Sequence, residues 1–157
     1  SRTSYGYVGD VGGMPPNLDA LVSNPGSYAT WKGPYLRDDY LPSSGSSNTE
    51  FKVDEWGTAY NYSAGNTIAS TGGGTTITRN LANSVSDLLY NSVAVAVTDL
   101  NLHSPGPVYD DSIRVVLIQP NGTGGTTTRT TIPSEDGFVK IDSVPIGQHS
   151  LKVIYLP

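Results

Sequence analysis

The second half of the chain consists of short apolar runs that turn residues interrupt about every ten positions. Val93, Val95 and Val97 alternate with alanines, as expected for a strand that buries one face. Residues 113–118, IRVVLI, are apolar on both faces and suit a central strand. Three further strands are expected at 126–132, 138–141 and 150–156. This spacing excludes long helices and predicts a small antiparallel β-sandwich over residues 89–157.

The composition narrows the choice of partners. The chain has 157 residues, a formal charge of −5 and no cysteine, so it forms no disulfide and no thiolate metal site. Its nine Lys and Arg are scattered singly, which makes nucleic acid and anionic membrane surfaces poor partners. No apolar run reaches the length of about 18 residues that a bilayer requires.

The first half of the chain predicts one short helix and a few short strands. Residues 1–16 are rich in glycine and proline and are expected to be irregular. Asn17 should cap a helix over residues 18–22, which Asn-Pro-Gly at 24–26 would end. Short strands are expected at 50–53, 58–63, 67–70 and 75–79. Residues 81–90 read as a helical turn or as the approach to a new strand, and we place the domain boundary there.

The stretch 31–62 carries both tryptophans of the chain and four of its ten tyrosines. Turn-forming residues stand directly beside the large rings, which indicates a loop held by aromatic anchors. The anchors are Trp31, Tyr35, Trp56, Tyr60 and Tyr62. We expect these rings to form a buried core, with Trp56 contributing the stabilisation of a buried aromatic residue. If the rings were exposed instead, they could stack on sugars.

Five motifs follow one another in the first half. They are Tyr7, Asp10, Gly12 and Pro15; LDALV at 18–22 with Pro25; WKGPYL at 31–36; Leu41-Pro42; and DEWG at 54–57 with AYNY at 59–62. In this order they resemble the major pseudopilin of bacterial type II secretion systems and, more broadly, type IV pilin-like proteins. Glu55 and Ala59 stand where the family has prolines, so the turn lacks that stiffening.

The resemblance implies a structural subunit of a pseudopilus or pilus filament that acts by assembly. Family members begin with a long apolar helix that resides in the membrane and packs in the filament core. Since this helix is absent here, the chain resembles the ectodomain of a longer protein, anchored in the bacterial inner membrane before assembly and then periplasmic or at the cell surface. Expected partners are other pilin or pseudopilin subunits, secreted cargo and assembly proteins. The polar tip at 43–48 and the downstream sandwich would face them.

The second half resembles the carboxypeptidase regulatory-like, or transthyretin-like, β-sandwich modules. The resemblance rests on Val-Thr-Asp at 97–99, Pro-Asn-Gly at 120–122, Asp-Gly-Phe at 136–138 and VPIGQHSL at 144–151. It implies no catalytic residue.

A calcium site is a weaker expectation. Members of the pseudopilin family carry aspartates in a calcium loop after the sheet, but the corresponding residues 70–77, STGGGTTI, contain no carboxylate. Calcium prefers several oxygen ligands with net negative charge, so we do not transfer the family site and expect no cofactor. Asp38, Asp39 and Asp54 remain as the only candidate calcium cluster.

The sequence offers no pattern for catalysis. Neighbouring acids occur at 38–39, 54–55, 110–111 and 135–136, but adjacent residues of a strand point apart and acids in turns are usually solvated. His103 and His149 are isolated in the sequence. We therefore expect no enzyme. The alternative function is a secreted or cell-surface β module that binds carbohydrate or protein.

Together these patterns predict an α+β, mostly β chain with two domains. Residues 1–88 would form a truncated pilin-like head, with a short helix and a small antiparallel sheet. Residues 89–157 would form the immunoglobulin-like or transthyretin-like sandwich.

Overall fold

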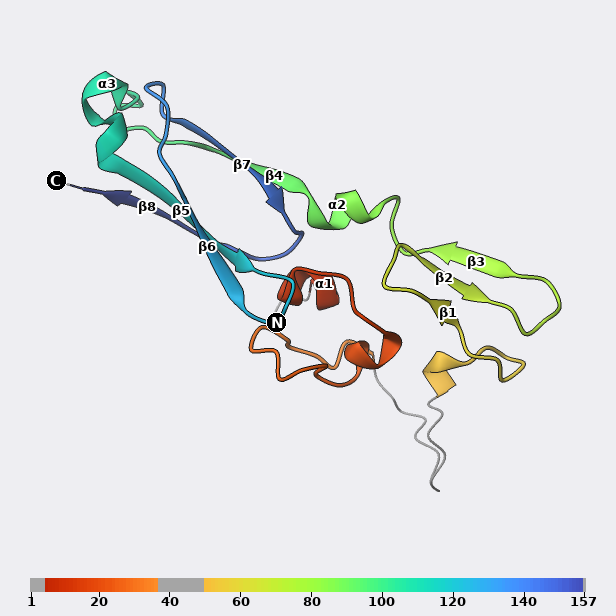
Figure 1. Cartoon of the computed structure of the whole chain (residues 1–157). Helices are drawn as coiled ribbons and strands as arrows, with labels where there is room; N and C mark the ends of the chain where they lie inside the picture. The colour runs from red at the N-terminus through yellow and green to blue at the C-terminus, as the bar shows by residue number, and fades with distance from the viewer. Residues whose placement is uncertain (1–4, 37–49, 157) are drawn as a thin grey trace.

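The computed structural model of the chain describes residues 5–36 and 50–156 (Figure 1). The described chain is α+β and mostly β, as the sequence predicts, with small antiparallel sheets and only short helices. Within these ranges no helix is long and apolar enough to cross a membrane.

Five strands form the second half, and their bounds are β4 Asn91–Ala96, β5 Ile113–Pro120, β6 Thr126–Thr131, β7 Phe138–Val144 and β8 Ser150–Tyr155. One sheet has the order β6-β5-β8 and the other pairs β4 with β7, all antiparallel. The apolar strand β5 lies in the centre of its sheet, which confirms the prediction for residues 113–118.

The two sheets enclose one hydrophobic core. Its fully buried members are Val115, Leu117, Val139, Ile141 and Val144. The valines of β4 pack against them, so the alternation of valine and alanine does bury one face of that strand. The residues between β4 and β5 form α3 (Gly106–Tyr109) and a 3-10 turn (η3, Asp110–Ser112), which the sequence patterns did not predict.

Residues 6–11 of the glycine-rich start form a helix, so the expectation of an irregular segment was wrong there, while residues 12–16 are irregular as expected. Helix α1 spans Gly6–Val11 and buries Tyr7 and Val11, which lie four residues apart on one face. The prediction for Asn17 is confirmed, since its side-chain oxygen accepts a hydrogen bond from the Ala20 N–H at 3.1 Å. The capped element is a 3-10 helix, η1 (Leu18–Leu21).

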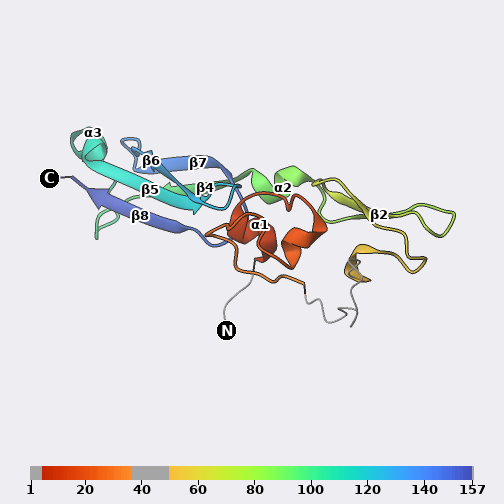
Figure 2. The same cartoon turned by 60° about the horizontal axis from the view of Figure 1, so that its bottom comes forward.

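The small sheet of the first half has the order β1-β2-β3, with the bounds β1 Asn61–Tyr62, β2 Thr67–Ser70 and β3 Ile77–Asn80. The predicted strand at 50–53 is instead a 3-10 turn, η2 (Glu50–Lys52), followed by a single bridge from Val53 to Ala59. Helix α2 (Val85–Leu89), which Ser84 caps, connects this sheet to the sandwich. Both views place the small sheet beyond α2 and away from the sandwich (Figures 1 and 2).

The N-terminal segment, defined here as residues 5–36, lies against the turns at one end of the sandwich (Figure 1). The Gly122 N–H donates to the Val11 carbonyl at 2.8 Å, and the Thr30 N–H donates to the Gly124 carbonyl at 3.2 Å. These backbone bonds cross the domain boundary that we place near residue 88. Part of the predicted head is therefore bonded to the predicted sandwich.

Candidate functional site

The N-terminal segment is held by a cluster of aromatic rings. Trp31 and Tyr35 meet edge to face, with ring centroids 5.6 Å apart and planes at 83°. Tyr7 meets Tyr35 in the same manner at 5.8 Å and 70°. Such edge contacts place the positive rim of one ring against the negative face of the next. The rings surround Val11 and Ala20, which are almost completely buried.

Hydrogen bonds fix the polar ends of these rings. The indole N–H of Trp31 donates to the Ala20 carbonyl at 2.8 Å. The Tyr35 hydroxyl donates to the Asp10 carboxylate at 2.9 Å and accepts from the Lys32 N–H at 3.0 Å. Each ring thus buries its apolar body and still satisfies its polar atom. Trp31 and Tyr35 are therefore partly buried rings whose polar atoms are bonded within the N-terminal segment.

The space beside the Trp31 ring requires glycine at position 33 of the WKGPYL motif. A Cβ atom added at Gly33 would lie 2.3 Å from the Trp31 ring. Any side chain at this position would displace the indole from the cluster. The position of the Trp31 ring therefore depends on the glycine at position 33.

Burial in this region changes the titration of two tyrosines. It raises the pKa of Tyr7 to about 12, and the neighbouring hydroxyls of Tyr28 and Tyr62 act in the same direction. Burial also raises the pKa of Tyr62, whose hydroxyl donates to the Pro15 carbonyl at 2.9 Å. Both phenols therefore stay neutral at physiological pH.

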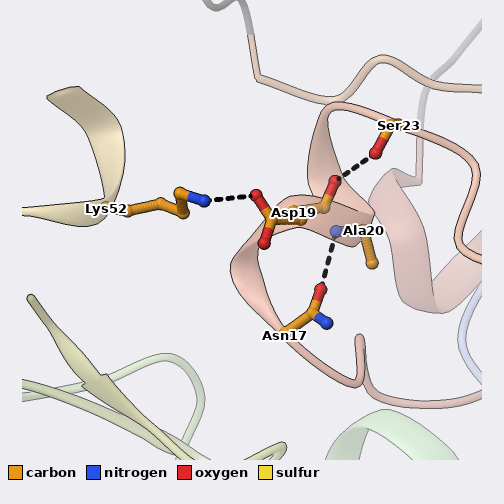
Figure 3. Close-up of polar contacts among 5 residues, drawn as sticks. All are labelled: Asn17, Asp19, Ala20, Ser23 and Lys52. Carbon is orange, nitrogen blue, oxygen red and sulfur yellow. Dashed lines mark hydrogen bonds and ion pairs between the residues drawn. The ribbon is translucent and has the colours of Figure 1, made fainter. Parts of the chain in front are cut away.

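Among residues 5–36 and 50–156, two side-chain contacts join the region of η2 and the small sheet to the N-terminal segment. One is the bond from Tyr62 to Pro15. The other is an ion pair between Lys52 Nζ and Asp19 Oδ1 at 2.7 Å (Figure 3). Figure 3 also shows Asn17 and Ser23 bonded to the same 3-10 turn that carries Asp19. The Tyr60 N–H donates to the Lys52 carbonyl at 2.8 Å, which connects η2 to the chain that leads into β1.

Asp54 is the most highly bonded side chain of the small sheet. One carboxylate oxygen accepts from the N–H groups of Trp56 and Thr58, at 3.1 and 2.9 Å. The other accepts from the Ser70 hydroxyl at 2.7 Å and the Gly72 N–H at 2.9 Å. The turn after Val53 is thereby bonded to the loop that follows β2. The signal for this role is an aspartate at the start of an Asp-x-x-Gly turn, although its second partner, the loop at 70–72, could not be identified from the sequence.

The same bonds determine the charge of Asp54. The side chain is only 6% exposed, and this burial disfavours the ionised form. The bonds from Ser70, Gly72, Thr58 and Trp56 outweigh burial and lower the pKa of the carboxyl. Asp54 is therefore an ionised carboxylate with protein donors on both of its oxygens.

The four donors to Asp54 compete with calcium for this carboxylate, which is one member of the calcium cluster proposed from the sequence. A carboxylate offers about four lone-pair positions, and four protein donors occupy those of Asp54. Asp38 and Asp39, the other members, lie outside the described residues. Among residues 5–36 and 50–156, no three His, Cys, Asp or Glu side chains come together as a metal site.

Trp56 differs from the expectation of a buried anchor, because 59% of its surface is exposed. Its ring lies against the backbone of Gly73, where an added Cβ would come within 2.6 Å of the indole. One part of the ring is covered by glycine and the remainder faces solvent. Placing Trp56 in the core was therefore wrong, since a ring beside a turn can equally well lie over a backbone at the surface.

A shallow hollow of about 280 Å³ adjoins Trp56. Tyr60, Ile77 and Arg79 contribute to its lining, together with the acidic residues 54 and 55. Ile77 is half exposed, so an apolar surface continues from the indole across the small sheet. The aromatic stretch thus divides into a buried part around Trp31 and an exposed part around Trp56.

The two histidines, His103 and His149, make local contacts. His103 lies 3.3 Å from Asp99, and both side chains are largely exposed. Hydrogen bonds from the N–H and side chain of His103 and from the Asn101 N–H lower the pKa of Asp99 in spite of some desolvation. His149 contacts the Pro145 carbonyl at 2.7 Å through its Nε2. Each histidine therefore supports a local turn.

No protein-family model, curated protein or solved structure matches this chain.

Proposed function

We propose that the chain is the ectodomain of a pilin-like subunit, of the pseudopilin or type IV pilin class, that acts by assembly and surface presentation. In this role it needs no active site and no cofactor. It meets its neighbours through surfaces, and its other partners would be secreted cargo or assembly proteins. The full-length protein would be held in the inner membrane by an N-terminal helix before assembly.

The observation that carries this proposal is that Trp31 and Tyr35 of the WKGPYL motif pack against the buried cluster of the N-terminal segment. Trp31 bonds the Ala20 carbonyl inside the N-terminal segment, and Tyr35 bonds Asp10. These are residues of the motifs on which the pseudopilin resemblance rests. The resemblance is thus carried by residues that build the segment, which is what a structural family requires, and not by residues of a ligand platform.

The test is the sequence and the assembly of the full-length protein. We expect a short basic leader, a cleavage site and about 20 apolar residues ahead of residue 1. We also expect epitope-tagged protein in the filaments sheared from cells, together with its loss when the prepilin peptidase gene is deleted. A full-length protein that begins with an ordinary secretion signal and is released as a soluble monomer would refute the proposal.

A secreted binding module remains the second candidate, and the exposure of Trp56 favours it. An indole that faces solvent beside Tyr60 and Arg79 offers a stacking surface of the kind that sugars use. Titration with oligosaccharides, followed by tryptophan fluorescence, tests this function. A response that disappears in Trp56→Ala and persists in Trp31→Phe would support binding, and the absence of any response across a glycan panel would reject it.

A further inference from the structure

Strand β8 carries apolar side chains that continue the core but lie uncovered. Leu151 is the register partner of Leu117, and Val153 is the partner of Val115. Paired residues of neighbouring strands share one face of a sheet, so these side chains point toward the interior. Leu117 and Val115 are buried, whereas Leu151, Val153 and Tyr155 are 44–58% exposed.

The exposure follows from the unequal size of the two sheets. In the described part of the chain, β8 is an edge strand of the three-stranded sheet, and the opposite sheet consists of β4 and β7 (Figure 2). Between the ends of β4 and β8 lies an open cavity of about 510 Å³. Val97, Tyr109, Ile113 and Tyr155 are among the residues that line it. The core is therefore open to solvent along this side.

The free edge of β8 presents the backbone of these same apolar residues. The Leu156 N–H donates to the Ser112 carbonyl at 2.7 Å, toward β5. In an antiparallel pair the backbone groups alternate between the two sides of a strand. The backbones of Leu151, Val153 and Tyr155 therefore point away from β5. Each of these residues offers an N–H and a carbonyl to a further strand, and an uncovered apolar side chain.

We propose that β8 pairs antiparallel with β8 of a second copy of this chain, about a twofold axis at Val153. In this register Val153 faces its own counterpart, and Leu151 faces Tyr155 of the other copy. The three outward-pointing residues of each strand then form three hydrogen-bonded pairs, or about six bonds at two bonds a pair. Their side chains lie in one row, which continues the core face across both copies.

The charge on the strand selects this register over its neighbour. Moving the axis to Lys152 would place two lysines directly opposite each other, which destabilises a strand pair. It would also leave Tyr155 outside the paired strands. With the axis at Val153, Lys152 faces Ile154 of the other copy. The strand is thus complementary to itself in the register that also forms the most hydrogen bonds.

The pairing goes beyond the proposed function and does not depend on it. A twofold contact closes on itself and makes a dimer, whereas the subunits of one polar filament need contacts that do not close. In a filament protein, β8 would therefore join two filaments or two free subunits. A row of three side chains falls short of the about 1,200 Å² that stable interfaces bury, so we expect association only at high concentration.

Single-cysteine variants test the register directly, because the chain has no cysteine of its own. In Val153→Cys the two Cα atoms would lie about 5.5 Å apart in a hydrogen-bonded pair, within the range that a disulfide spans. In Leu151→Cys the two positions would be about 13 Å apart along the strands, at four residues of about 3.3 Å each. We expect oxidation to give covalent dimer at least about tenfold faster for Val153→Cys, since Cα atoms beyond about 7 Å cannot be bridged. Equal rates for the two variants, or no dimer from Val153→Cys at millimolar concentration, would overturn the proposal.

A second measurement separates pairing from folding. Val153→Pro removes an N–H that points away from β5, at an edge position where proline is tolerated. We expect sedimentation equilibrium to find the wild type partly dimeric at millimolar concentration and Val153→Pro monomeric, with the two melting temperatures close together. A wild type that stays monomeric at this concentration would refute self-pairing. Binding of a strand of another protein at β8 by this monomer would show that the edge has a different partner. That result would leave the filament role to its own test.

Discussion

Replacing Trp31 by alanine should destabilise the N-terminal segment much more than the same replacement at Trp56. The two residues make a matched pair, because they are the only tryptophans of the chain and differ mainly in burial. Trp31 packs in the ring cluster and bonds the Ala20 carbonyl, whereas Trp56 lies at the surface over Gly73. Identical chemistry is thus removed from two different environments.

The structure sets the size of each effect. Truncation of a buried tryptophan to alanine costs about 3–5 kcal/mol, and the partial exposure of Trp31 favours the lower end, about 3 kcal/mol. Within this figure, the edge contact with Tyr35 accounts for about 0.5–1.5 kcal/mol. Trp31→Phe retains the packing and removes only the donor to Ala20, so we expect it to cost about 1 kcal/mol. Trp56→Ala should cost less than about 1 kcal/mol, because most of its ring is already in water.

Urea unfolding followed by circular dichroism measures the free energy of each variant. Hydrogen exchange of the amides at 18–22 then assigns the loss to the N-terminal segment. We expect faster exchange there in Trp31→Ala, and exchange close to wild type in Trp56→Ala. An intermediate value for Trp31→Phe would separate the hydrogen bond from the packing.

The opposite order would refute this reasoning. If Trp56→Ala cost as much as Trp31→Ala, Trp56 would be part of the core after all. If Trp31→Ala left both stability and exchange unchanged, the ring cluster would not hold the segment together.

Three further predictions concern the small sheet. The pKa of Asp54 in the folded protein lies below its ordinary value of 3.8, so the ionised carboxylate contributes its full stabilisation above pH 3.8 and loses it as pH falls through the folded pKa. Asp54→Asn should therefore lower the melting temperature at pH 7 and flatten the dependence of the melting temperature on pH below about pH 4. Millimolar calcium should leave the melting temperature equal to that in EGTA, since a ligand that binds the native state would raise it, and a rise that persists in Asp54→Asn would instead locate a calcium site elsewhere. Lys52→Met, which breaks the partly exposed ion pair with Asp19, should cost less than about 1 kcal/mol in urea unfolding, with Asp19→Asn as the matched control; a much larger loss would mean that this pair holds the sheet in place.

The sequence was most informative where local pattern and tertiary environment agree. The apolar run of β5 predicted a central strand because a strand covered on both faces needs apolar residues on both. Asn17 predicted its cap because the bond to the Ala20 N–H is formed within four residues of chain. The strands at 67–70 and 150–156 were likewise placed within a residue.

It was least informative where distant segments decide the outcome. Helix α1 forms in a glycine-rich stretch because Tyr7 and Val11 are buried by the rings of Tyr35 and Trp31, which lie 20 or more residues away in the chain. Propensity alone disfavours that helix. The sequence also did not determine which tryptophan is buried, because Trp31 and Trp56 stand in similar glycine-containing turns. They differ in the tertiary contacts that cover each ring.

The candidate site was predicted only in part. Among the rings proposed as anchors, Trp31 and Tyr35 pack together in the N-terminal segment, and the Tyr62 hydroxyl donates to the Pro15 carbonyl. The bonds from Asp54 to Ser70 and Gly72 were missed, because they join residues on two different turns. The same loop was notable in the sequence only for lacking carboxylates, and the structure supplies one to it from Asp54.

Two backbone hydrogen bonds join the N-terminal segment to the β5–β6 turn, and they determine how a mechanical force applied to the chain would be transmitted. Val11 and Thr30 are tied to Gly122 and Gly124, at the turn between β5 and β6. A pull between α1 and β8 would reach β5 directly through these two bonds, and residues 50–80, which touch the N-terminal segment through side-chain contacts, would carry the smaller share of the load. Rupture of the two backbone bonds would transfer the remaining force to the small sheet. That sheet can therefore change in length or sequence without weakening the mechanical connection between the two ends of the chain.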